Sequence, residues 1–117
     1  MNNYDGWRGT GDEHAFLYRK DGKTIDLGTL GGQFSFSNAM NDLCEIVGSS
    51  TINKKFEPDL HAFIWDKKYG MRDLTQLIPT KTGWDKLIKA TSINNSGQIV
   101  GIGKYNGVMQ IFLLEPL

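Results

Sequence analysis

The chain has 117 residues, a length that fits one domain and can bury a core without disulfides. Thirteen basic side chains balance thirteen acidic ones, and this zero net charge argues against nucleic acid or an anionic membrane as the main partner. Cys44 is the single cysteine, which excludes an intrachain disulfide and a thiolate metal cluster, and no apolar run is long enough to cross a membrane.

Residues 1–13 are polar and glycine-rich, and two interpretations of them stay open. They form either a loose leader or a degenerate strand, because Trp7-Arg8-Gly9 stands before His14 as Ile46-Val47-Gly48 stands before His61. The first residues have neither a basic start nor an apolar stretch, so the sequence predicts no signal peptide.

Apolar and polar residues alternate from His14 onward, which is typical of short strands. The sequence predicts a strand from His14 to Tyr18 and a second at 24–27, joined by a tight turn at Asp21-Gly22. A third strand is expected after Phe34, and a fourth at 46–49.

The second half of the chain repeats the first. His61 to Trp65 corresponds to His14 to Tyr18, with only like-for-like exchanges. In both copies an Asp-Leu pair begins twelve residues after the histidine, and both copies end in Ile-Val-Gly. The repeated positions are His14 and His61, Asp26 and Asp73, and Gly48 and Gly101.

These matches define units at about 14–50 and 61–103, with a partial third unit at 108–117. The second unit carries six extra residues, which fall between Ile78 and Lys89. We expect this insert to protrude as a loop or a short helix, because the repeat closes without it. Within it, Trp84, Leu87 and Ile88 have the spacing of one helical face.

About ten short strands separated by turns indicate an all-β fold in a single domain, residues 14–117. Short connections favour antiparallel meanders of about four strands, which resemble the blades of a β-propeller. Two units and a fragment are too few to close a propeller, so apolar faces and strand edges would stay in water. We therefore expect a homo-oligomer, most simply a two-fold dimer, in which the C-terminal strand pairs with another strand.

Taken together, these motifs resemble the HAF repeat family, a set of bacterial sequences described as probable extracellular repeats. The resemblance covers about residues 14–114 and is closest in the first unit, through His14 to Tyr18, the Asp-Leu-Gly-Thr-Leu-Gly-Gly segment at 26–32 and Ile46-Val47-Gly48. It implies a repeat fold and an exported location, and it implies no catalytic activity. Two features depart from the family pattern. Cys44 replaces a glycine, and the second unit lacks the glycine pair after its Asp-Leu.

The histidines and aspartates recur once in each unit, which favours structural roles over catalysis or zinc binding. We predict no catalytic residue, metal or cofactor. Three aromatic residues, Trp7, Trp84 and Tyr105, are expected in loops or inserts outside the repeat pattern and are candidates for contact with a ligand. For Trp84 the alternative is that it covers the core.

The sequence favours a non-enzymatic interaction module that binds itself and a protein or carbohydrate ligand, with no nucleic acid or membrane partner. The rival interpretation is a small carbohydrate hydrolase or lyase with its site at the mouth of assembled blades. A third is a fragment of a longer gene that has lost its function.

Overall fold

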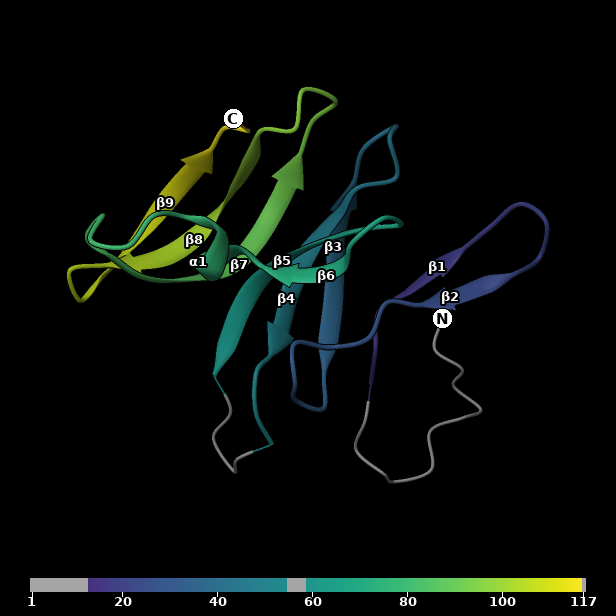
Figure 1. Cartoon of the computed structure of the whole chain (residues 1–117), viewed down its shortest axis with the longest axis horizontal. Helices are drawn as coiled ribbons and strands as arrows, with labels where there is room; N and C mark the ends of the chain where they lie inside the picture. Colours follow the sequence, from purple (N-terminus) through teal and green to yellow (C-terminus); the bar gives the residue numbers. More distant parts are fainter. Residues whose placement is uncertain (1–12, 55–58, 117) are drawn as a thin grey trace.

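The computed structural model describes residues 13–54 and 59–116, and strands dominate this part of the chain (Figure 1). The all-β prediction is confirmed. The elements in order are β1 Phe16–Tyr18, β2 Thr24–Asp26, β3 Ser35–Met40, β4 Ile46–Thr51, β5 Leu60–Asp66, β6 Gly70–Asp73, α1 Leu74–Leu77, β7 Trp84–Ile93, β8 Ile99–Tyr105 and β9 Val108–Leu114. No helix in the described part is long and apolar enough to span a membrane.

The strands form three antiparallel sheets, ordered β1-β2, β3-β4-β5-β6 and β7-β8-β9. The complete four-stranded meander joins the last two strands of the first sequence unit to the first two of the second, because β4 pairs with β5. In this arrangement β1, β5 and β9 are equivalent strands. The four-stranded sheet therefore begins halfway through a sequence unit.

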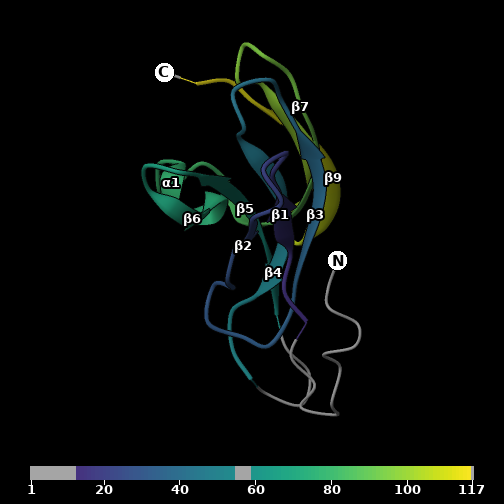
Figure 2. The same cartoon turned by 90° about the vertical axis from the view of Figure 1, so that its right-hand side faces the viewer.

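The sheets lie side by side, with β1-β2 at one end of Figure 1 and β9 at the other. Seen from the side in Figure 2, α1 and β6 project from one side of the other strands. Two buried clusters fill the spaces between the sheets. One joins the β1-β2 hairpin to the four-stranded sheet, and its members are Ala15, Leu17, Leu27, Ile46, Phe63 and Trp65. The other joins the four-stranded sheet to β7-β9, and its members are Val47, Ala62, Ile64, Leu74, Leu87, Ala90, Ile93, Ile99 and Phe112.

The prediction of a loop or short helix at residues 78–89 is wrong for the second half of this segment. Residues from Trp84 onward belong to β7, and Leu87 is fully buried. The register of β7 against β8 shifts three times, so its buried residues recur every third position, at Leu87, Ala90 and Ile93. Each β-bulge adds one residue to the two-residue period of a strand, and the result imitates the spacing of a helix.

Glycine is required at the repeated positions 48 and 101. A Cβ at Gly48 would overlap the carbonyl of Phe36, and one at Gly101 would overlap the carbonyl of Lys89. Both contacts lie where a strand is bulged against its neighbour, since register shifts occur beside residues 37 and 89. The repeated glycine therefore lets a bulged strand approach closely in each sheet.

Candidate functional site

The repeated histidines and aspartates bond to each other. The Nδ1 atom of His14 lies 2.9 Å from Oδ1 of Asp26, and Nδ1 of His61 lies 2.9 Å from Oδ2 of Asp73. In each sheet the aspartate sits opposite the residue two positions after its histidine, so the pair crosses the hairpin diagonally. The twelve-residue spacing in the sequence therefore reflects one hairpin built twice.

Each carboxylate also closes the turn that follows it. Asp26 accepts a hydrogen bond from the backbone N–H of Gly28, and Asp73 accepts one from Thr75 at the start of α1. The carboxylate thus bonds both to its histidine and to a backbone donor. In the described part of the chain no hydroxyl or thiol bonds to either imidazole, so neither pair is joined to a nucleophile.

The two pairs differ in exposure. The side chains of His61 and Asp73 are 14% and 13% exposed, whereas those of His14 and Asp26 are 28% and 51% exposed. The β5-β6 hairpin belongs to the complete sheet, whereas β1-β2 stands alone as a two-stranded sheet. The same His–Asp hydrogen bond forms in both hairpins, and the surrounding sheet determines how exposed the pair is to water.

Equivalent asparagine turns connect two of the sheets. Asn41 and Asn94 each accept two backbone hydrogen bonds within their own turns. The Asn41 amide also donates to the carbonyl of Asn94 at 3.0 Å, and Asp42 and Asn95 exchange two further bonds. These residues form hairpin turns. Among the described residues no cluster of three potential metal ligands occurs.

The aromatic candidates do not form a loop site. Trp7 lies outside the described residues, whereas Trp84 begins β7 and Tyr105 ends β8. The rings of Trp84 and Tyr105 meet edge to face with centroids 5.1 Å apart, and Trp84 meets Phe112 in the same way at 6.1 Å. The placement of Trp84 and Tyr105 in loops was therefore wrong, and Trp84 covers the core at one end of the sheet.

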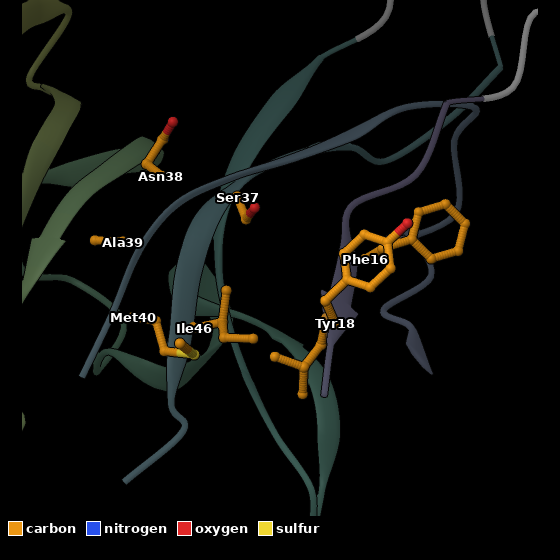
Figure 3. Close-up of a pocket in the computed structure, with 8 residues that line it drawn as sticks. Phe16, Tyr18, Ser37, Asn38, Ala39, Met40 and Ile46 are labelled. Carbon is orange, nitrogen blue, oxygen red and sulfur yellow. The ribbon is translucent and has the colours of Figure 1, made fainter. Parts of the chain in front are cut away.

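An open hollow lies between β1 and β3, with a volume of about 380 Å³ (Figure 3). Side chains of β1, including Phe16 and Tyr18, form one wall, and residues of β3 and β4, including Met40 and Ile46, form the other. The hollow exists because the β1-β2 sheet has two strands and does not extend over β3.

A second hollow of about 380 Å³ lies between α1, β5 and the end of the C-terminal sheet. Its walls are mainly apolar, and Arg72, Glu45 and Glu115 supply its charged groups. The Arg72 guanidinium lies over the ring of Tyr69, at 4.5 Å from the centroid, and donates to Asp66 at 3.2 Å. Its Nε atom is buried and has no hydrogen-bond partner among the described residues. Acidic groups on the same walls disfavour an anionic ligand here.

A large difference between equivalent positions lies on the outer face of the C-terminal sheet, where the sequence leads us to expect an apolar face in water. Val47, Ala62 and Ile64 of the four-stranded sheet are 0%, 0% and 8% exposed, because they pack on β7-β9. The pairing of Gly48 with Phe63, and of Gly101 with Phe112, makes Val100, Ile111 and Leu113 their counterparts. These counterparts are 38%, 76% and 58% exposed. We call these three residues the outer apolar triad.

Comparison with known proteins finds no matching family model, curated protein or solved structure. The resemblance to HAF repeats therefore stays a prediction. The fold class rests on the three sheets themselves, and the function must be inferred from the surfaces that those sheets present.

Proposed function

We propose that this protein is a non-enzymatic protein-interaction module, built from HAF-like repeats, which binds its partners through the outer apolar triad. The observation that carries the proposal is the contrast between equivalent positions in two sheets. In one sheet these positions are fully packed, and in the next they are in water.

The stacking of the sheets supports this choice of surface. Leu17 of β1 and Ala15, just before it, pack on the four-stranded sheet, and their counterparts Ala62 and Ile64 pack on the C-terminal sheet. The same positions thus form a sheet-to-sheet contact twice within the chain. In the third copy these positions are Ile111 and Leu113. Isoleucine stands where the first two copies have alanine, and both side chains are exposed. Covering apolar surface contributes roughly 25 cal/mol per Å² that leaves water, so this face favours association.

The competing hydrolase interpretation depends on the His–Asp pairs. An inverting or retaining glycosidase needs two carboxyl groups with different environments facing one sugar. Asp26 and Asp73 instead occupy equivalent positions in separate hairpins, and each is bonded to its own histidine and to a turn N–H. This internal pairing supports a structural role.

Photocrosslinking tests the proposal. Benzoylphenylalanine in place of Leu113 should form protein adducts, with itself or with another protein, in purified samples and in extract. The lysine substitution Ile111→Lys, in the same triad, should abolish the adducts. Val108→Lys is the matched control, because Val108 is 55% exposed but lies on the opposite face of β9, and it should leave them intact.

Adducts that survive Ile111→Lys would contradict the proposal, as would their absence in the parent chain. Incubation with a panel of polysaccharides provides the second arm. Release of reducing ends that disappears in a folded His61→Asn variant would favour the hydrolase instead.

A further inference from the structure

β9 differs from the other strands at the sheet edges. It has seven residues, with no charge, no proline and no register shift against β8. β3 and β7 are bulged, β7 also carries lysines, β6 has only four residues including Arg72 and Asp73, and β1 and β2 have three residues each. Bulges, charges and short length are the features that stop an edge strand from pairing with another chain. β9 has none of them.

The geometry of the preceding turn shows which backbone groups of β9 are free. Asn106 and Gly107 have φ angles of 48° and 81°, as in the two-residue turns that close a hairpin with a hydrogen-bonded pair, here Tyr105 and Val108. Hydrogen-bonded pairs alternate along an antiparallel ladder, so the even-numbered residues of β9 bond to β8. The N–H and C=O groups of Met109, Ile111 and Leu113 therefore point away from β8, and no other described strand pairs with them.

We propose that two copies of this chain pair antiparallel through β9 about a two-fold axis at Ile111. The pairing makes one six-stranded sheet in the order β7-β8-β9-β9-β8-β7. In this register Ile111 faces the partner's Ile111, and Met109 faces the partner's Leu113. Every free N–H and C=O group of these three residues then meets a free group of opposite kind. The inference rests on the proposed interaction function and names its partner and geometry.

The side chains agree with this register. Residues 109, 111 and 113 share the outer face of the sheet and are 54%, 76% and 58% exposed. Two-fold pairing brings them directly opposite one another and continues the apolar face across the axis. No charged side chain of β9 opposes another, because the strand has none, and the chain's net charge of zero adds no long-range repulsion.

The four-stranded sheet provides a precedent for the site. Its strand β5, the counterpart of β9, is paired along the same edge by β6, from Phe63 opposite Asp73 to Asp66 opposite Gly70. The equivalent edge of β9 accepts a strand in the same way. A second β9 has the same length and, when it runs antiparallel, offers the complementary N–H and C=O groups.

A cysteine substitution tests the axis. Ile111→Cys, made in a Cys44→Ser background, places two thiols opposite each other with Cα atoms about 5.5 Å apart, which is within the range of a disulfide. Mild oxidation should convert it to a covalent dimer. Val100→Cys is the matched control, because it lies on the same face one strand away from the axis, and it should stay reduced. Equal cross-linking of the two variants, or none at position 111, would overturn the proposed register.

Light scattering on lysine variants separates this inference from the proposed function. Ile111→Lys should raise the dimer dissociation constant by roughly tenfold or more, and Val100→Lys should change it by less than about threefold. Ile111 is the most exposed apolar residue of β9, so its lysine variant should fold. A chain that is monomeric at all concentrations, but still forms adducts from position 113 with another protein, rejects the dimer and keeps the interaction module. A monomer that forms no adduct rejects both.

Discussion

The two faces of the β7-β9 sheet carry similar apolar residues and meet different surroundings. The inner face, with Leu87, Ala90 and Phe112, is covered by the four-stranded sheet and forms the main core. The outer face carries Val100, Ile111 and Leu113 and is covered by nothing in the described part of the chain. A repeated motif therefore specifies which positions are apolar, and the neighbouring sheet decides whether they become core or exposed surface.

The largest expected effect comes from comparing two equivalent positions, one buried in the core and one exposed on the outer face. Ile64→Ala should lower the free energy of unfolding by about 2–5 kcal/mol, because it opens a cavity between two sheets. Leu113→Ala, at the counterpart position, should change it by no more than about 0.5 kcal/mol. Both variants should be measured by urea unfolding in an Ile111→Lys background, so that association does not contribute. Equal losses would show that the outer face is part of the monomer's core.

A second comparison uses the repeated glycines. Gly48→Ala and Gly101→Ala should each destabilise the fold by about 1–3 kcal/mol, because the new Cβ overlaps a backbone carbonyl that is fixed by strand pairing. Gly107→Ala serves as the control, since no atom of the described residues, apart from its two chain neighbours, lies within 4 Å of its Cβ position, so its cost comes from its φ of 81°. Thermal unfolding measures all three. A tolerated Gly48→Ala would show that β3 and β4 do not approach as described.

The histidines give the third comparison. His61→Ala should cost about 1–3 kcal/mol, because it leaves the largely buried Asp73 carboxylate without its partner. His14→Ala should cost less than His61→Ala, since Asp26 is half-exposed and water can replace the imidazole. Urea unfolding checks both variants. The reverse order would mean that the β1-β2 hairpin depends on its His–Asp pair more than the four-stranded sheet depends on its own.

The smallest effect concerns the turns between β3 and β4 and between β7 and β8. Cys44 has a φ of 64°, a conformation that glycine adopts without strain, and its counterpart Gly97 has a φ of 85°. Cys44→Gly should therefore be neutral or stabilising by up to about 1 kcal/mol, as judged from the midpoint of thermal unfolding. A clear loss of stability would show that the Cys44 side chain contributes packing that outweighs this strain.

The sequence predicts the strands well where turn residues and alternation agree. The hairpin at Asp21-Gly22 lies where expected, and Asn-Gly, a typical hairpin turn, closes another at residues 106–107, with positive φ at both glycines. The pairing of each histidine with its aspartate follows from their constant spacing once the hairpin is known. These features are local, so short segments contain the information that defines them.

The features that sequence reasoning missed depend on contacts between distant segments. The bulges of β7 give its buried residues a three-residue spacing, which a helix also produces, and only pairing with β8 distinguishes the two. The four-stranded sheet crosses the boundary between sequence units, since β4 pairs with β5 rather than ending a unit. The number of repeats predicts that an apolar face stays in water, but it does not single out Ile111 and Leu113, because their buried counterparts are also apolar.

Amide hydrogen exchange at two adjacent residues of β9 tests the central claim most directly. The N–H of Phe112 points toward β8, and the N–H of Ile111 points toward the free edge. If β9 pairs with a second copy, the exchange of Ile111 should slow as protein concentration rises and approach that of Phe112, whose exchange stays slow throughout. An Ile111 amide that exchanges rapidly at every concentration, beside a protected Phe112, would contradict the account.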